Sequence, residues 1–177
     1  FLNWDDEENV VFAENLRKSP LRIFGWVFTD FTVGDFKPLA WISYVFDYNF
    51  WRLNPVGYHL GNLLLHCASA VTVFFLFLAQ GRRFTKNGDG AIAPALIAAL
   101  FFSLSPLRTE SVAWISERKD VLCAFFYLAA VLAYINYNRK KGVFLYVLIL
   151  LLAGLALLSK PMAVTIPIAL ILVDVLG

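Results

Sequence analysis

Residues 105–120 read SPLRTESVAWISERKD and place six formally charged side chains between two almost wholly apolar runs, 91–104 and 121–133. Hydrophobic residues make up 60% of the chain, charged residues 16%, and the mean hydropathy is +0.69. Soluble domains are usually about 45–50% apolar and about 25% charged. The apolar runs are therefore predicted to be membrane spans, and the charged stretch a polar cap at the bilayer edge, where charges often mark a site.

The apolar runs predict an all-α fold, a polytopic transmembrane helix bundle. The run 38–53 begins with Pro38, which suits the first position of a helix, and is rich in Trp and Tyr. It is shorter than the ~20 residues that a span needs, so we expect it to lie in the membrane interface; if it crossed instead, every later loop would change sides. Residues 1–57 are thus predicted to be an outer loop with interfacial helices, and 58–177 a transmembrane bundle. The five predicted spans cover 58–79, 91–104, 121–137, 143–158 and 162–176.

Basic residues set the predicted orientation. The loops 81–90 and 138–142 each carry three basic side chains and at most one acid, so the positive-inside rule makes them cytoplasmic. The acidic cluster 5–8, the hairpin 105–120 and Lys160 then share the opposite face, which is periplasmic or lumenal. The abrupt ends of the chain favour a piece of a longer membrane protein with a span before residue 1.

Carboxylates and basic side chains on that outer face form the candidate site. Asp5 and Asp6 are expected just after the missing span, where a partly desolvated carboxylate suits general-base work; the competing interpretation is a solvated acidic loop end. Arg and Lys at the ends of spans can hold an anionic headgroup or a diphosphate. They can equally be interfacial side chains paired with neighbouring acids. The candidate cations are Arg108, Arg118, Lys119 and Lys160, and the acids are Glu110, Glu117 and Asp120.

The two histidines and two cysteines carry weaker signals. His59 and His66 share one helical face, but two turns is too far for one shared ion, so hydrogen-bonded residues inside a bundle are favoured over a metal pair. His59, at the outer end, is kept as a supporting site residue. Cys67 and Cys123 lie in apolar runs and are expected to be buried free thiols. The sequence therefore offers no convincing set of metal ligands; a divalent metal stays undecided, with none favoured, and no other cofactor is indicated.

Five strings, in this order, resemble the membrane domain of the transmembrane and tetratricopeptide-repeat proteins. They are NWDD at 3–6, KPL at 37–39, NPVGYHLGNLLLH at 54–66, PLRTESVAWISERKDVL at 106–122 and LSKPM at 158–162. That family is similar to the GT-C glycosyltransferases, and its animal members are linked to protein O-mannosylation. The resemblance covers nearly the whole chain, and the long string at 106–122 is its most specific part.

The resemblance implies a lipid-linked sugar donor, such as a polyprenyl-phosphate hexose, that enters from the bilayer, and a protein or glycan acceptor on the outer side. It implies no nucleic-acid partner. Asp5 or Asp6 would deprotonate the acceptor hydroxyl, and the basic residues of the hairpin would bind the leaving phosphate. It also implies further spans and a tetratricopeptide array. Relatives often carry His where this chain has Ser105, which puts activity in doubt if that His is catalytic. Some GT-C relatives use a divalent metal and others do not.

Three functions remain open at this point. A membrane glycosyltransferase moving mannose or another hexose requires Asp5 or Asp6 and the hairpin arginines around one outer cavity. A non-catalytic membrane anchor for a repeat scaffold would pair Arg118 with Glu117 or Asp120 and have no cavity. A transporter of lipid-linked sugar, the weakest option, would need a polar path through the bilayer.

Overall fold

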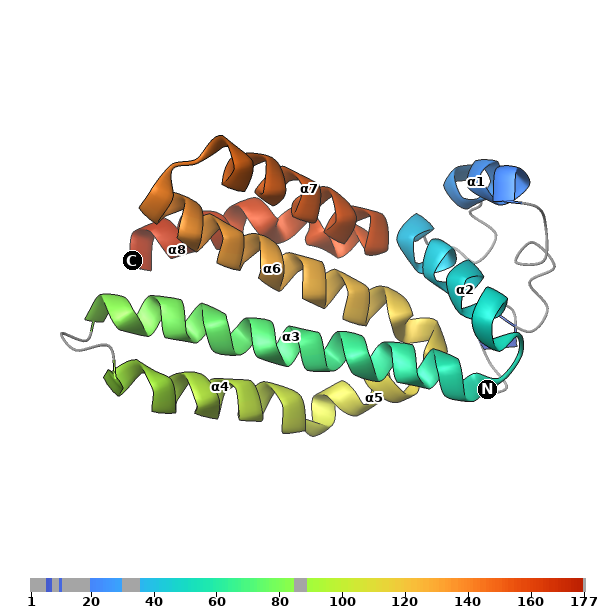
Figure 1. Cartoon of the computed structure of the whole chain (residues 1–177), viewed down its shortest axis with the longest axis horizontal. Coiled ribbons are helices and arrows are strands. Elements are labelled where there is room, and N and C mark those ends of the chain that lie inside the picture. Colours follow the sequence, from blue (N-terminus) through green and yellow to red (C-terminus); the bar gives the residue numbers. More distant parts are fainter. Residues whose placement is uncertain (1–5, 8–9, 11–19, 30–35, 85–88, 177) are drawn as a thin grey trace.

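The computed structural model describes residues 6–7, 10, 20–29, 36–84 and 89–176, and the regular elements in these ranges are all helical (Figure 1). The fold class, an all-α helix bundle, is therefore confirmed. The α-helices are α1 (Pro20–Thr29), α2 (Pro38–Trp51), α3 (Pro55–Phe84), α4 (Ile92–Leu104), α5 (Thr109–Ala113), α6 (Arg118–Lys140), α7 (Val143–Ser159) and α8 (Ile166–Leu176). Short 3-10 turns separate several of them: η3 (Asp89–Ala91), η4 (Pro106–Arg108), η5 (Ile115–Glu117) and η6 (Pro161–Thr165).

Helices α3 and α6 form the centre of the bundle. They pack against each other, α4 lies on the far side of α3, and α7 and α8 lie against α6 (Figure 1). Two helical stretches are long and apolar enough to cross a membrane, Pro55–Arg82 and Ile115–Lys140, and a third crossing is possible if α4 and the bent segment after it form one span. The two remaining apolar helices are shorter than a typical span. Five spans therefore stay a prediction.

Proline marks the start of many helices, as expected from its fixed φ and its missing N–H. Pro38 and Pro55 open α2 and α3, while Pro106 and Pro161 open the turns η4 and η6. The side chain of Asn54 adds a cap to α3, because its Oδ1 accepts a hydrogen bond from the Val56 N–H at 3.1 Å. The boundaries predicted from the sequence are close to those observed, with α3 longer than expected.

The charged stretch 105–120 is not the simple hairpin that we predicted. It consists of η4, α5 and η5, and α6 begins at Arg118, so Arg118, Lys119 and Asp120 belong to the first turn of the central helix. The axis bends by 50° between α4 and the segment Pro106–Ala113. The bend follows from Pro106, which cannot donate the backbone hydrogen bond that would continue α4.

The two ends of the bundle differ in character. The α3–α4 connection and the α6–α7 turn lie at one end, and α1, α2 and α5 lie at the other, which we call the cap end (Figure 1). In the α6–α7 turn Lys141 has a φ of 45°, the left-handed conformation that closes the helix. This grouping matches the predicted sidedness of the loops, while the membrane face that each end occupies stays a prediction.

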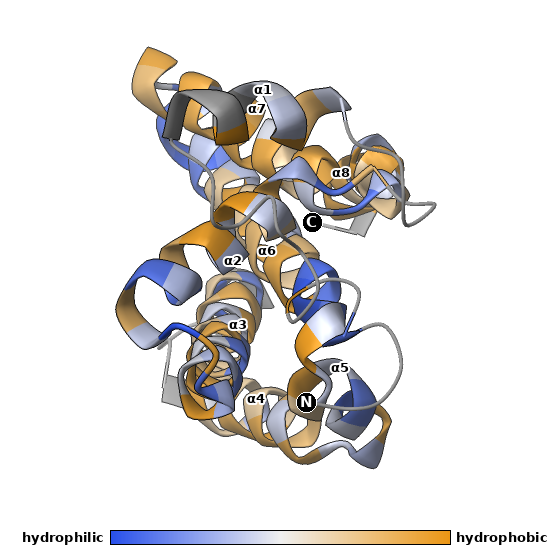
Figure 2. Cartoon of the chain, turned by 90° about the vertical axis from the view of Figure 1, so that its right-hand side faces the viewer, coloured by the Kyte–Doolittle hydropathy of each residue, from blue (hydrophilic) through white to orange (hydrophobic). Residues whose placement is uncertain are grey.

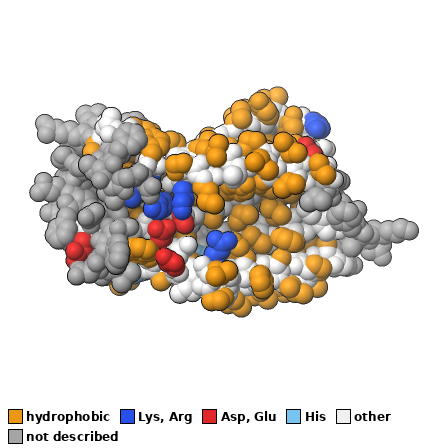
Figure 3. Space-filling model, turned by 180° about the vertical axis from the view of Figure 1, so that it is seen from behind, with side chains coloured by type: hydrophobic (Ala, Val, Ile, Leu, Met, Phe, Trp, Pro, Cys, Tyr) orange, Lys and Arg blue, Asp and Glu red, His pale blue; other side chains and the backbone are white. Residues whose placement is uncertain are grey.

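A hydrophobic cluster joins the cap to the bundle. It includes Trp41 and Tyr44 of α2, Tyr58 of α3, Ile115 of η5 and Leu122 of α6. The helices of the bundle carry many exposed large apolar residues and are coloured largely as hydrophobic in Figure 2, as expected for helices that face lipid. In the rear view, acidic and basic side chains gather at the cap end (Figure 3).

Candidate functional site

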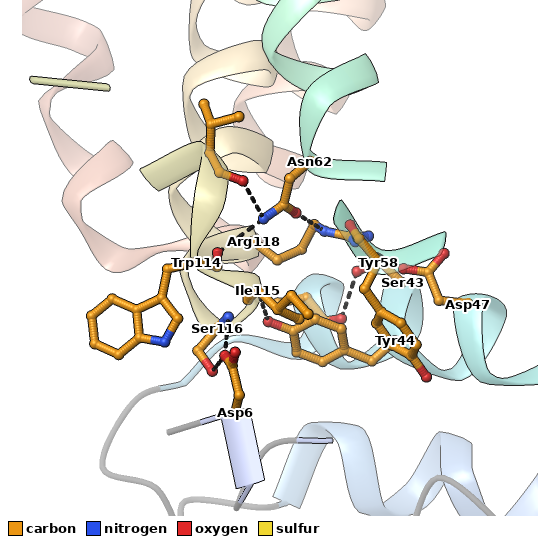
Figure 4. Close-up of polar contacts among 12 residues, drawn as sticks. Asp6, Ser43, Tyr44, Asp47, Tyr58, Asn62, Trp114, Ile115, Ser116 and Arg118 are labelled. Carbon is orange, nitrogen blue, oxygen red and sulfur yellow. Dashed lines mark hydrogen bonds and ion pairs between the residues drawn. The ribbon is translucent and has the colours of Figure 1, made fainter. Parts of the chain in front are cut away.

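Arg118 is the centre of a buried polar cluster where α2, α3 and α6 meet (Figure 4). Its side chain is 3% exposed. Its Nε donates to Oδ1 of Asn62, and its Nη2 donates to the backbone oxygen of Tyr58 at 2.7 Å. Nη2 also lies 2.8 Å from Oδ2 of Asp47. The guanidinium also lies over the ring of Tyr44, 5.7 Å from its centroid. Arg118 therefore ties the interfacial helix to both central helices.

The partners of Arg118 are held in place by further hydrogen bonds. Asn62 donates to the backbone oxygens of Trp114 and Val112 at 2.9 and 3.3 Å, and the Tyr44 hydroxyl donates to the Ile115 oxygen at 2.9 Å. Burial raises the pKa of the Asp47 carboxyl above its ordinary value, and the positive charge of Arg118 opposes that rise. The cluster thus ties α3 to the segment between α5 and α6 and holds a carboxylate largely away from water.

Asp6 also lies at the cap end, next to the start of α6 (Figure 4). It is 1% exposed, and its Oδ1 accepts hydrogen bonds from the N–H and the hydroxyl of Ser116, at 2.8 and 2.5 Å. An accepting carboxylate at this position stabilises the positive end of the helix that follows. Asp6 is therefore buried and hydrogen-bonded, which the interpretation as a solvated loop end did not anticipate. Asp5 lies outside the described residues.

A cavity of about 330 Å³ opens between the bend after α4, the start of α6 and the turn η6. Two of the predicted phosphate-binding residues, Arg108 and Lys160, line it together with Asp120. Its remaining walls are mostly apolar, with the hydroxyls of Tyr127 and Thr165 added. Asp6 and Arg118 are not among the described residues that line this cavity, so the predicted site residues divide between two places.

The charges in this cavity are arranged unequally. Lys160 forms an ion pair with Asp120, and both side chains are about one-third exposed, at 32% and 29%. Arg108 is exposed and stacks over the ring of Phe102, with its guanidinium carbon 5.0 Å from the centroid. No acid among the described residues pairs with Arg108. The cavity therefore has a net positive charge and can accept an anion.

The other predicted site residues lie outside the cavity. Lys119 lies 3.7 Å from Glu117, a long ion pair whose side chains are 13% and 16% exposed. Glu110 and His59 are exposed. No three His, Cys, Asp or Glu side chains within the described ranges come close enough together to hold a metal ion. Of the two cysteines, Cys123 is buried as expected and Cys67 is exposed on α3, so the expectation of burial was wrong for Cys67.

The pairing of the candidate cations with neighbouring acids, one of the two interpretations drawn from the sequence, is found for Lys119 and not for Arg118. The ion-pair partner of Arg118 among the described residues is Asp47 rather than Glu117 or Asp120, and Asp120 pairs with Lys160. Sequence reasoning did not identify Asp47 as a site residue, although an acid in an aromatic helix was a usable signal, because a charge there needs a partner.

Comparisons with known proteins identify relatives among curated sequences. No family model matches the chain, and no solved structure matches it. Among curated proteins it is similar to Protein O-mannosyl-transferase TMTC4 of Homo sapiens, 33% identical over 144 residues that cover 74% of this chain and 19% of the relative. It is also similar to Protein O-mannosyl-transferase Tmtc1 of Drosophila melanogaster, 34% identical over 134 residues that cover 75% of this chain and 14% of the relative.

A third relative has higher identity over a shorter region. Protein O-mannosyl-transferase TMTC2 of Mus musculus is 38% identical over 109 residues, which cover 60% of this chain and 12% of the relative. The chain thus spans less than a fifth of the length of these relatives. Through this segment, the chain belongs to the family of the transmembrane and tetratricopeptide-repeat (TMTC) proteins.

Proposed function

We propose that this protein is a membrane glycosyltransferase that moves a hexose, with mannose the first choice, from a polyprenyl-phosphate donor to a hydroxyl group of a protein or glycan acceptor. The observation that carries the proposal is the cavity lined by Arg108 and Lys160. It combines two cations with apolar walls at one end of an apolar bundle. A lipid-linked sugar phosphate needs this combination, an anion-binding end beside a surface for its chain. The names of the relatives, protein O-mannosyl-transferases, support the same reaction class.

In the proposed mechanism, Arg108 and Lys160 bind the phosphate of the donor. The acceptor oxygen attacks the anomeric carbon and loses its proton to a carboxylate. The bond between that carbon and the phosphate oxygen breaks, and its electron pair leaves with the polyprenyl phosphate, where the two cations stabilise the charge. A single displacement of this kind inverts the anomeric configuration. The Asp120 carboxylate, paired with Lys160, must yield part of that contact to the phosphate.

The base is proposed to be Asp5 or Asp6. Asp6 lies at the cap end, and its Oδ1 is occupied by Ser116. Arg118 no longer belongs with the phosphate-binding residues in this proposal, because its donors are directed to Asn62, Tyr58 and Asp47. The phosphate site therefore narrows to Arg108 and Lys160, and the reaction is proposed to take place on the periplasmic or lumenal side.

The anchor remains a second candidate because one observation favours it. The Arg118 cluster satisfies its own charges inside the fold, as expected of residues that fix a bundle. An anchor needs no anion-binding cavity, however, and the cavity at Arg108 and Lys160 has no structural role in the packing described above. The two functions therefore predict different results for Arg108 variants.

The test uses full-length protein in membranes and a labelled polyprenyl-phosphate hexose. Charge-assisted hydrogen bonds are worth about 1.5–3 kcal/mol, so Arg108→Ala or Lys160→Ala should weaken donor binding by about 10- to 100-fold. Lys140→Ala, an exposed lysine at the opposite end, is the matched control. Cys123 lines the cavity, so bound donor should also protect it from maleimide in a Cys67→Ser background. Transfer that is unaffected by both cavity variants would contradict the proposal, and intact protein without any transfer would favour the anchor.

A further inference from the structure

His66 is a buried histidine whose ring nitrogens are in different situations. Its side chain is on α3, 9% exposed, and its ring stacks on Phe102 with centroids 5.4 Å apart. Nε2 lies 3.2 Å from the backbone oxygen of Ser103. A carbonyl oxygen can only accept, so Nε2 must carry the proton. In the neutral imidazole this leaves Nδ1 as a hydrogen-bond acceptor.

The bond to Ser103 has a structural explanation. Helix α4 ends at Leu104 and the axis then bends by 50°. The last carbonyl groups of α4 therefore lack the backbone N–H donors that a following helical turn would supply. His66 donates to one of them. This accounts for Nε2 but leaves Nδ1 without a hydrogen-bond partner among the described residues.

A small polar recess adjoins the cavity of the proposed site at this point. Its volume is about 20 Å³, and His66, Ser69 and Ser111 contribute to its lining. Four residues line both spaces: Phe102, Arg108, Asp120 and Ala124. Since one water-sized group needs roughly 10–15 Å³, the recess has room for a single hydroxyl group. The Ser69 hydroxyl already donates to the Leu65 oxygen at 2.9 Å, so it cannot donate to Nδ1 at the same time.

We infer that His66 is a specificity-determining residue, whose Nδ1 accepts a hydrogen bond from one hydroxyl group of the hexose carried by the lipid phosphate. The inference rests on the proposed function and names the part of the site that recognises the sugar. With the phosphate at Arg108 and Lys160, the sugar next to it is within reach of the recess that shares Arg108 and Asp120. An acceptor on a side chain that is only 9% exposed discriminates, because a donor that lacks the matching hydroxyl does not form this hydrogen bond.

Two substitutions separate this role from the structural one. The amide nitrogen of glutamine reaches approximately where Nε2 of histidine lies, so His66→Gln can keep the bond to Ser103 and loses the acceptor at Nδ1. In His66→Asn the amide lies near the position of Nδ1, and the bond to Ser103 is lost. A purely structural histidine predicts that His66→Asn is the more harmful change and that neither variant alters the choice among sugars.

The experiment measures kcat/KM of the full-length protein with the intact polyprenyl-phosphate hexose and with a panel of mono-deoxy donors, each lacking one hydroxyl. The wild type should use one deoxy donor about tenfold less well than the intact donor. His66→Gln should lose about tenfold with the intact donor and little with that deoxy donor, so that the preference disappears, while His66→Asn should retain part of it. Thermal unfolding of each variant checks that the fold is kept.

The outcomes distinguish a failure of the proposed role of His66 from a failure of the proposed function. An equal loss with all donors in His66→Gln, or a wild type that discriminates against none of them, would overturn the role of His66 and leave the transferase intact. A wild type that does not transfer from the intact donor, together with a Cys67→Ser variant in which this donor does not protect Cys123, would overturn the proposed function and this inference together.

Discussion

Replacing Arg118 with leucine is expected to lower the free energy of unfolding by about 3–5 kcal/mol, because removing one partner of a buried ion pair leaves the other as an uncompensated charge. The side chains of Arg118 and Asp47 are 3% and 11% exposed, so most of the lost contact is not replaced by bulk water. Asn62 Oδ1 and the Tyr58 carbonyl lose a donor in the same substitution. Arg118→Lys keeps the charge but not the forked geometry, so an intermediate loss is expected.

A double-mutant cycle tests the origin of that loss. Asp47→Asn removes the charge that Arg118→Leu leaves unpaired, so the double variant should be more stable than Arg118→Leu alone, by about 1–3 kcal/mol. Equilibrium unfolding of purified protein in detergent micelles, followed by helical circular dichroism, gives the four free energies. Lys140→Ala serves as a surface control and should change stability by less than about 0.5 kcal/mol.

One result would refute this interpretation of Arg118. If Arg118→Leu unfolds with a free energy within about 1 kcal/mol of the wild type and yet cannot bind the polyprenyl-phosphate donor, then Arg118 serves the phosphate and not the fold. The original assignment of Arg118 as a phosphate-binding residue would then be restored. The opposite pattern, low stability with donor affinity kept in the folded fraction, supports the structural role.

Three other predictions concern backbone packing, pH and the membrane. Gly61→Ala should destabilise the protein by about 1–3 kcal/mol, because its new Cβ would lie 2.7 Å from Nη2 of Arg118. The new Cβ of Gly154→Ala meets nothing within 4 Å, so this control should not destabilise the protein. Equal effects of the two substitutions in the unfolding assay would contradict the prediction. Because burial raises the pKa of Asp47 in the folded state, the native protein binds the proton more tightly than the unfolded chain, so stability from this group falls as pH rises. The wild type should therefore gain stability relative to Asp47→Asn on acidification from pH ~7 towards the ordinary aspartate pKa of about 4, and a relative loss would show that the ion pair dominates. Phe46 on α2 is 64% exposed, and replacing it with serine should reduce quenching of tryptophan fluorescence by brominated lipids if α2 lies on the bilayer. Unchanged quenching would contradict the interfacial position.

The sequence predicted the helices well because long apolar runs and prolines determine them locally. Pro38 opens α2 where expected, whereas Pro55 opens α3 three residues before the predicted start of the span at residue 58. The turn at Lys141 lies in the basic loop 138–142 that was predicted to separate two spans. The start of α6 was harder to predict, since six charges within 105–120 suggested a solvated hairpin. Arg118 can join a buried helical turn there because its partners come from α2 and α3.

The candidate site was predictable in its residue types and not in its grouping. Arg108 and Lys160 were chosen as cations at the ends of apolar runs, and they do meet at one cavity. Arg108 and Lys160 are separated from Arg118 because of the direction in which the Arg118 side chain leaves α6 and because of the bend after α4. Neither feature has a local sequence signal. The roles of Asp47 and His66 depend on contacts with Arg118 and Ser103, which lie far away in the sequence.

The Arg118 cluster also has a consequence for how the chain is made. The carboxylate of Asp47, the carbonyl of Tyr58 and the amide of Asn62 all precede Arg118 in the chain, so a ribosome synthesises these partners before the arginine that needs them. When α6 emerges, its first turn can leave the translocation channel with its charge already matched, provided that α2 and α3 have settled correctly. A mistake in either earlier helix would leave an arginine stranded at the edge of the lipid, which is costly and exposes the error to quality control. The cluster thus makes the matching of one charge depend on the placement of three helices, α2, α3 and α6.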